Sequence, residues 1–401
     1  MDALRWIRNL IVAASVAGLL LGCGAPPASP VAPTPVASAS PAPASATATS
    51  PPAAAPADTP LPPTATPAPV ATVPPAPTPT EAVRADGLSA AEAATLGSLE
   101  QVDGHPLYTM RYYGPYEQRR AAVGAAREPL VARPASAPPA WACSLFAAMG
   151  DPDSMLYGRN FDWEPSPAVL LFTQPPGGYA SVSMVDIAYL GFTGAAAGDL
   201  LELPLVERQA LLDAPFLPFD GMNERGLVVG MAAVPPGDVP PDPTKKTVGS
   251  LGVIREMLDR ASNVEQAVEI LRSYNIDFSD GPALHYLVAD PSGRALLVEF
   301  YGGEMFVIPN EAPYHLATNF LRTAAGESAA GECWRYDMLD NRLAQAAGRM
   351  APRDALGLLD AVSQDNTQWS IVYGISTAEI RVAMGHKYDA VHTFQLDAAG
   401  D

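Results

Sequence analysis

The sequence predicts an α+β fold built around a single core. Apolar stretches of strand length recur in pairs around turns rich in Gly, Pro and Asp, which favours antiparallel hairpins. Helical periodicity is confined to blocks between those strand runs, so we expect layers of helices rather than a parallel, doubly wound sheet. Residues 83–401 are enough to bury one sizeable core, which predicts one domain.

Local patterns place the elements along the chain. Ser89 is positioned to begin the first helix, and Asn263 is a cap for the fourth. The expected helices are Leu88–Leu99, Arg119–Arg127, Val248–Arg260, Val264–Tyr274, Glu332–Ala347 and Pro352–Val362. The expected strands are His105–Tyr113, a hairpin headed by Cys143, Val169–Phe172, Ala180–Val185, Leu227–Ala232, Ala283–Ala289, Ala295–Phe300, Met305–Ile308, Tyr314–Phe320, Gln368–Gly374, Glu379–Met384 and Val391–Leu396. The segment Phe219–Gly226 is expected to be a tight turn.

Residues 1–23 have the features of a signal peptide. Arg5 and Arg8 precede an apolar run at Leu10–Leu21, which is too short to cross a bilayer as a helix. The run ends in Leu-Leu-Gly-Cys, which resembles a bacterial lipobox and implies cleavage before Cys23 and lipidation of its sulfur. The alternative is an ordinary secretory signal. We expect a protein that is exported and lipid-anchored to the outer face of the cytoplasmic membrane.

Residues 24–82 form a segment rich in Pro, Ala and Thr that predicts a disordered tether. Residues 25–82 hold 19 of the 43 prolines, only two charged residues and no aromatic residue. Such a chain buries too little surface to offset its ordering entropy. The whole chain carries a net charge of −19, which argues against nucleic acid as a partner.

A thiol is the strongest candidate nucleophile. The sequence has no G-x-S-x-G, H-E-x-x-H or paired Cys-x-x-Cys motif, no phosphate-binding glycine loop, and five histidines without metal-ligand spacing. We therefore expect no cofactor and no metal. With Cys23 assigned to the lipid, Cys143 and Cys333 remain, and in an exported protein these two could pair in a disulfide. The polar residues that follow Cys143 favour a catalytic thiol instead.

Arg159 and Asp162 lie close to Cys143 in sequence and could serve it. Strand alternation sends these two side chains to opposite faces, so both reach one thiol only at a bend or strand end. The base that a thiol needs is either His285 or His315, both on expected strands, or the α-amine that Cys143 would gain as an N-terminus. With the amine as base, Arg159 would lower the thiol pKa and Asp162 would hold the ammonium.

Six short motifs occur in order between Cys143 and Tyr373, within a similarity that covers about residues 100–397. They are Cys143-Ser144, Gly158–Trp163, Asn223–Leu227, Ala317–Phe320, Arg335-Tyr336 and Trp369–Tyr373. Together they resemble the N-terminal-nucleophile (Ntn) linear amide hydrolases, which include choloylglycine hydrolases, penicillin V acylases, acid ceramidase-like amidases and acyl-coenzyme A:6-aminopenicillanate acyltransferases. The steps of 16 and 19 residues from Cys143 to Arg159 and Asp162 fit that pattern.

The resemblance implies a four-layer αββα sandwich of two mainly antiparallel sheets between helices. It also implies hydrolysis of a linear, non-peptide carbon–nitrogen bond in an N-acyl substrate, through a thioester. The implied catalytic residues are Cys143 as nucleophile with its own amine as base, Arg159 and Asp162 in support, Asn223 and Asn319 for the oxyanion and substrate, and Arg335. The residues alone explain Asn223 better as a turn former.

The position of Cys143 implies processing. It lies 120 positions after Cys23, whereas in members with a short leader the nucleophile directly follows the removed segment. The acyltransferase and acid-amidase branch cuts itself ahead of this Cys, so we expect autoproteolysis between Ala142 and Cys143. Residues 83–142 would remain bound as a small subunit, and residues 143–401 would form the catalytic region of a heterodimer.

The expected substrate is a small N-acyl amide, whose identity the sequence leaves open. Acyl transfer to an amine on the same site and a non-catalytic lipid-anchored binding protein are the alternatives; a papain-like protease lacks its C-G-S-C-W neighbourhood. The candidate residues of an acyl pocket, equally suited to the core, are Phe161, Phe172, Tyr189, Phe192, Phe216 and Trp369.

Overall fold

The computed structural model describes residues 87–117, 119, 142–193, 200–237, 239–279, 281–325 and 328–397. The expected signal peptide at 1–23 with Cys23, the tether at 24–82, and all but one residue of the expected helix Arg119–Arg127 lie outside these residues. Within the described part, no helix has the length and apolar character needed to span a bilayer.

Two large sheets form the centre of the described structure. The nine-stranded sheet has the order β1-β2-β5-β6-β7-β8-β11-β12-β13, and the six-stranded sheet has the order β14-β3-β4-β15-β16-β17. Their pairings are antiparallel except for β2 with β5. The strands are β1 Glu100–Asp103, β2 Leu107–Tyr112, β3 Ala142–Ala148, β4 Leu156–Asp162, β5 Ala168–Thr173, β6 Ser181–Asp186, β7 Asp220–Asn223, β8 Val228–Ala233, β11 Leu284–Ala289, β12 Ala295–Tyr301, β13 Glu304–Pro309, β14 Tyr314–Ala317, β15 Thr367–Gly374, β16 Glu379–Met384 and β17 His392–Gln395.

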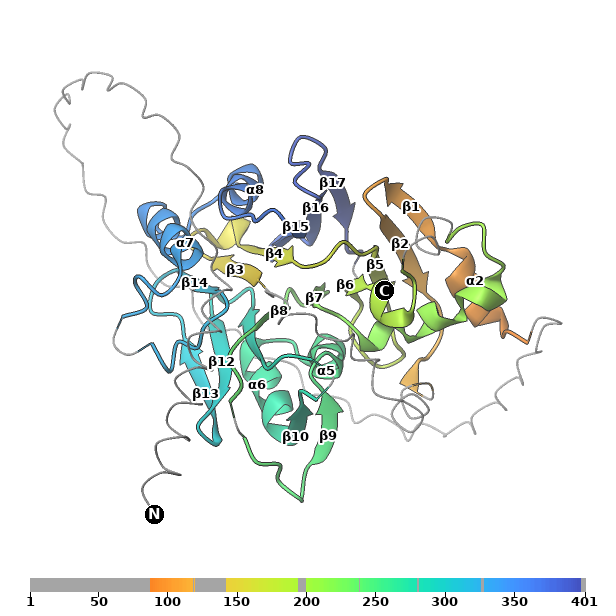
Figure 1. Cartoon of the computed structure of the whole chain (residues 1–401), viewed down its shortest axis with the longest axis horizontal. Helices are drawn as coiled ribbons and strands as arrows, with labels where there is room; N and C mark the ends of the chain where they lie inside the picture. Colours follow the sequence, from red (N-terminus) through yellow and green to blue (C-terminus); the bar gives the residue numbers. More distant parts are fainter. Residues whose placement is uncertain are drawn as a thin grey trace, which may run out of the picture. The chain divides into compact units, whose positions relative to one another are not determined.

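Helices cover the outer faces of both sheets (Figure 1). Helices α5 (Gly252–Arg260) and α6 (Val264–Ser273) pack on β7, β8, β11 and β12 of the nine-stranded sheet. Helices α7 (Trp334–Gln345) and α8 (Pro352–Ala361) pack on β3, β4, β14 and β15 of the six-stranded sheet. The sheets face each other through β3 against β8 and β12 against β14. The predicted α+β class and its αββα layering are confirmed.

The segment before Ala142 is part of the same core. Helix α2 (Ala90–Gly97) begins with a capping box in which Ser89 and Glu92 bond each other's backbone N–H. Strand β2 pairs with β5 inside the nine-stranded sheet, and the Tyr116 hydroxyl donates to Asp259 Oδ1 at 2.7 Å. A second apolar cluster lies between α2, the 3₁₀ helix η4 (Leu205–Phe216) and this part of the sheet. A fragment cut after Ala142 would therefore share buried surface with the rest.

Some elements differ from expectation. The segment expected as a turn after Phe219 contains strand β7, because hydrogen bonds from β6 and β8 on both sides hold it extended. The expected helix start at Val248 lies instead in β9 (Lys246–Gly249), which pairs in parallel with β10 (Tyr274–Asp277) in a separate small sheet. Short helices η2 (Pro152–Ser154) and η3 (Ile187–Leu190) were also not expected.

Candidate active site

Cys143 is the second residue of β3, between β14 and β4 in the six-stranded sheet. Its side chain is 0% exposed and its thiol is free, so the alternative of a Cys143–Cys333 disulfide is wrong. Cys333 is buried at the start of α7. The Cys143 thiol is therefore free and enclosed in the interior.

Arg159 reaches the sulfur from the neighbouring strand. In the β3–β4 register Cys143 lies opposite Phe161, and Arg159, two residues earlier, has the same facing as Phe161. Its Nη2 lies 3.7 Å from Cys143 Sγ, and its Nη1 donates to the Phe219 carbonyl oxygen at 2.7 Å. Arg159 is 0% exposed, so its charge acts on the sulfur with little screening.

Asp220 is a site residue that the sequence reasoning did not identify. Its carboxylate forms a buried ion pair with Arg159 and also accepts a hydrogen bond from the Tyr373 hydroxyl. Both partners come from the six-stranded sheet, whereas Asp220 is the first residue of β7 in the other sheet. In the sequence, Asp220 is marked only as an acidic residue directly before a glycine in an apolar stretch. That pattern suits a turn equally well.

A second group of polar side chains surrounds the backbone of Cys143. Its N–H donates to Asn319 Oδ1 at 2.7 Å, and its carbonyl oxygen accepts from Arg335 Nη1. Arg335 also donates to Asn319 Oδ1 and to Ser144 Oγ, both at 2.9 Å. Asn319 lies two residues after β14, and Arg335 lies in the first turn of α7. Asn319 and Arg335, both far from Cys143 in sequence, thus converge on the two peptide groups that flank its Cα.

Asp162 is on the opposite face of β4 from Arg159, as strand alternation predicts. Its carboxylate lies 3.9 Å from Arg335 Nη1, beside the backbone of Cys143, and has no hydrogen bond to the sulfur. Gln364 Nε2 and Thr367 Oγ1 donate to it at 2.9 and 2.5 Å. The site therefore has a thiol side with Arg159 and a backbone side with Asp162, Asn319 and Arg335.

Burial controls the electrostatics of the uncut site. It raises the pKa of the Cys143 thiol above its usual value, and the nearby Arg159 guanidinium offsets only part of this. Arg159 lowers the pKa of the thiol, as expected, but the net shift of that pKa is upward. Burial likewise raises the pKa of Asp162, against the opposing effect of Arg335.

Neither candidate histidine serves as the base. His285 Nδ1 lies 3.1 Å from Glu299 Oε1 inside the nine-stranded sheet. His315 Nε2 lies 3.0 Å from the Ile308 carbonyl oxygen, and its Nδ1 accepts the Leu316 N–H at 3.1 Å. Burial lowers the pKa of His315 to about 4. Both rings have structural partners, so the Cys–His interpretation is wrong for this arrangement.

Asn223 is not in the site, so its assignment to the oxyanion is corrected here. Its Nδ2 donates to the carbonyl oxygens of Leu258 and Ala261 at 3.0 and 2.8 Å, and its Oδ1 accepts the N–H groups of Arg225 and Leu227 at 3.0 and 3.2 Å. These four bonds use its full capacity. It holds the β7–β8 turn against the end of α5, as a turn former would.

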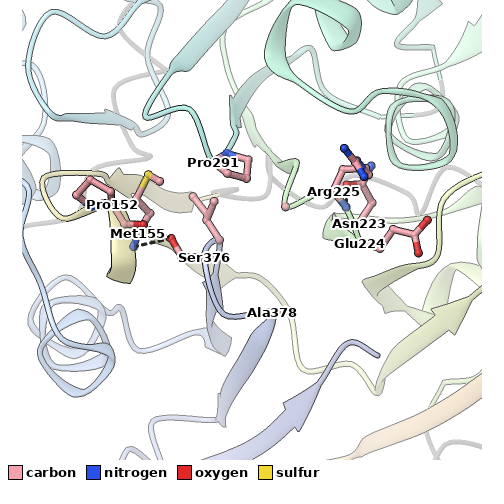
Figure 2. Close-up of a pocket in the computed structure, with 10 residues that line it drawn as sticks. Pro152, Met155, Asn223, Glu224, Arg225, Pro291, Ser376 and Ala378 are labelled. Atoms are coloured by element: carbon pink, nitrogen blue, oxygen red, sulfur yellow. Dashed lines mark hydrogen bonds between the residues drawn. The ribbon is translucent and has the colours of Figure 1, made fainter. Parts of the chain in front are cut away.

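Asn223 lines a pocket of about 360 Å³ between turns at one end of the sheets (Figure 2). The other lining residues come from the turns before β4, after β7, after β11 and after β15: Pro152, Met155, Glu224, Arg225, Gly226, Pro291, Ile375, Ser376 and Ala378. Met155 directly precedes β4, whereas Cys143 pairs near the last residue of that strand. The pocket and the thiol therefore lie at opposite ends of the β3–β4 hairpin.

The structure divides the six aromatic candidates for an acyl pocket. Phe161 stacks on Trp369 with a centroid distance of 4.2 Å, and the Arg159 guanidinium lies 5.0 Å from the Phe161 ring. Tyr189 joins them through an edge contact at 5.4 Å with Phe219, which the sequence reasoning missed. The other three lie elsewhere, Phe192 and Phe216 in the cluster under α2 and Phe172 against Arg111.

Several known proteins are similar to parts of this chain. Residues 218–346 match the family model of the acyl-coenzyme A:6-aminopenicillanic acid acyl-transferases. An uncharacterized protein of Paramecium bursaria Chlorella virus 1 is 32% identical over 109 residues, which are 25% of this chain and 38% of that protein. The chain thus spans well under half the length of the curated relative that it matches.

Two solved structures are also similar. A conjugated bile acid hydrolase from Clostridium perfringens matches with a TM-score of 0.47 and 15% identity, over 63% of this chain and 92% of that one. A penicillin V acylase from Agrobacterium tumefaciens matches with a TM-score of 0.43 and 15% identity, over 60% and 83% of the two chains.

The family match confirms the resemblance to the N-terminal-nucleophile linear amide hydrolase superfamily. Within that superfamily, the matched family is that of the acyl-coenzyme A:6-aminopenicillanic acid acyl-transferases, and the matched residues include Asn319 and Arg335.

Proposed function

We propose that this chain is a self-cleaving amidase that uses the Cys143 thiol to hydrolyse a linear N-acyl amide. The observation that carries the proposal is the convergence on one residue of three groups from separate elements. Arg159 lies at its sulfur, Asn319 at its backbone nitrogen and Arg335 at its carbonyl oxygen. The family match supports the same class of acyl chemistry.

Self-cleavage acts on the peptide bond before the nucleophile. The Cys143 thiol attacks the Ala142 carbonyl carbon, the C–N bond breaks, and the thiol proton passes to the nitrogen, which becomes the α-amine of Cys143. Water then hydrolyses the thioester, releasing the Ala142 carboxylate and restoring the thiol. The positioning groups are Asn319, which accepts the N–H of this peptide bond, and Arg335, which donates to Asn319 and to the Cys143 carbonyl oxygen.

Substrate turnover repeats the chemistry with a free amine as base. An α-amine titrates near ~7.7–8.0, close enough to a thiol to take its proton. The thiolate attacks the acyl carbonyl, the leaving amine takes the proton, and water resolves the thioester to a carboxylic acid. Asp162, which pairs with Ala142 across the β3–β4 hairpin, would hold the ammonium form. Arg159 favours the thiolate.

An amine that replaces water as the acceptor would make the same site an acyltransferase. The family match is the specific observation that favours testing this alternative. A panel of chromogenic acyl amides of graded chain length, with and without added amine, separates the two outcomes. Free acid as the product supports the hydrolase, and a new amide supports the transferase.

Residues 1–82 supply the proposed location. A lipid on Cys23 would anchor the protein to the outer face of the cytoplasmic membrane, and the segment 24–82 would act as its tether. Because the anchor would lie on the fragment before Ala142, the catalytic fragment would stay at the membrane only through contacts such as the β2–β5 pairing. Detergent release of both fragments together, and loss of membrane binding in Cys23→Ala, would support this.

Electrophoresis tests the central claim directly. The purified chain should give two bands under denaturing conditions, with Cys143 as the first residue of the larger fragment, and Cys143→Ala should give one band without activity. Iodoacetamide should label Cys143 far faster after cleavage, because its sulfur is inaccessible in the uncut chain. An uncut chain with full activity would refute self-cleavage, and a cut or uncut chain inert toward every amide would favour a binding protein.

A further inference from the structure

Glu299 is a buried carboxylate of the nine-stranded sheet that holds a loop of the other sheet. Its side chain is 0% exposed. Oε1 accepts the Arg322 N–H at 2.8 Å, and Oε2 accepts the N–H and the hydroxyl of Thr323 at 2.9 and 2.8 Å. His285 Nδ1 completes the set at 3.1 Å from Oε1. A buried carboxylate is stable only with such donors, and three of the four belong to one loop.

That loop, residues 318–323, carries Asn319. Asn319 Nδ2 donates to the Ala233 carbonyl oxygen of β8 at 2.9 Å, while its Oδ1 accepts the Cys143 N–H of the other sheet at 2.7 Å. Glu299 holds the far end of the same loop. The position of Asn319 between the sheets is thus fixed from the nine-stranded side at two points.

We propose that Glu299 is a positioning residue that aligns Asn319 with the Cys143 peptide and thereby sets the rate of self-cleavage and of turnover. This inference rests on the proposed function. The hydrogen bonds of Glu299 go to His285 and the loop, so its effect on the thiol passes through Asn319.

The ionisation state of the Glu299 carboxylate agrees with this role. Burial alone would raise the pKa of Glu299, but the His285 hydrogen bond and the backbone donors outweigh it, so its pKa lies below the usual value. Glu299 is therefore ionised at neutral pH and accepts all of its bonds. A glutamine in its place has an NH₂ group instead of one carboxylate oxygen, and this group cannot accept the backbone N–H that the oxygen accepts.

A double-mutant cycle tests the proposal. Glu299→Gln should slow self-cleavage by about tenfold, because hydrogen bonds to a charged carboxylate are lost. It should also lower kcat on an acyl amide while KM stays within about twofold, because the changed group does not contact the substrate. In the Asn319→Ala background the same substitution should change the residual rate by less than about twofold. Glu304→Gln, an exposed glutamate on the adjacent strand, is the matched control and should change neither rate.

The outcomes are separable. If Glu299→Gln slows both backgrounds by the same factor, or leaves the wild-type rate unchanged, the positioning role is overturned. If the wild-type chain neither cleaves nor hydrolyses, the proposed function fails instead. Should Glu299→Gln fail to fold, Thr323→Val removes one bond to the carboxylate, and its rate loss must likewise disappear in the Asn319→Ala background.

Discussion

The two ends of the β3–β4 hairpin are built differently. At the Cys143 end, Arg159, Asp220 and Arg335 are fully buried and Asn319 is half-buried. These groups bond partners distant in sequence: Arg159 with Asp220, and Asn319 and Arg335 with Cys143. At the turn end, Asn223 bonds residues two and four positions away as well as the end of α5, and turns surround an open pocket. The described cavity is therefore not where the candidate chemistry lies.

The difference shows how the groups of the proposed site can be positioned around a thiol that is closed to solvent. Sheet hydrogen bonds, an ion pair and amide contacts already position the groups around the Cys143 peptide, while the sulfur has no access to solvent. Substitutions at the two ends should accordingly differ in their effects on the free energy of unfolding and on the rate of self-cleavage.

The largest effect is expected for the buried ion pair at the closed end. Asp220→Ala leaves the Arg159 charge unpaired in the interior and should lower the free energy of unfolding by about 3–5 kcal/mol. Arg225→Ala, an exposed cation at the turn end, should stay within about 0.5 kcal/mol. Denaturant unfolding of uncut protein in a Cys143→Ala background measures both. Equal losses would contradict the distinction between the ends.

The two asparagines should separate rate from stability. Asn319→Ala should slow self-cleavage by about 10²-fold, as removal of an active-site hydrogen-bonding group typically does. Asn223→Ala should leave the rate of the folded chain nearly unchanged but destabilise it by about 1–3 kcal/mol, because buried backbone groups lose partners. Time courses on gels and thermal melts give the two readouts. If Asn223→Ala cleaves slowly but is fully stable, Asn223 belongs to the site after all.

A smaller effect is expected at Gly226, in the turn beside the pocket. Its φ is 74°, and a Cβ there would lie 2.5 Å from Pro291 Cγ and 2.9 Å from the Ile375 carbonyl oxygen. Gly226→Ala should therefore lower the free energy of unfolding by about 1–3 kcal/mol, without loss of self-cleavage at a temperature where it folds. Slower cleavage at equal folded fraction would show that the two ends are coupled.

The smallest effect concerns the contact between the segment before the cut and the end of the six-stranded sheet. Burial would raise the pKa of Asp103, but bonds from His392, the His105 N–H and Lys387 lower it to about 2. Because the pKa in the folded state lies below the ordinary value near ~3.9, the ionised carboxylate stabilises the fold at any pH above that value. This stabilisation is lost as the pH falls through about 2. The Tm difference between wild type and Asp103→Asn should be full at pH 7 and shrink in acid; a constant difference would contradict this.

Local patterns predicted much of the fold and the vicinity of the thiol. Arg159 and Asp162 follow Cys143 across one hairpin, so alternation and a short register already restrict where they point. The resemblance added Asn319 and Arg335, whose contacts span 176 and 192 residues and leave no local signal. Asp220 and Glu299 were missed for the same reason, since a buried carboxylate shows its purpose only through its partners.

The sequence by itself determined the α+β class, the hairpin that carries Cys143, and the opposite facing of Arg159 and Asp162, because covalent geometry makes strand side chains alternate. Only the tertiary structure decided that Asn223 serves a turn, that Asp220 pairs with Arg159, and that half of the candidate aromatic residues lie away from the thiol. Those outcomes depend on how two sheets meet. Their hydrogen bonds and ion pairs form only once distant strands are in register.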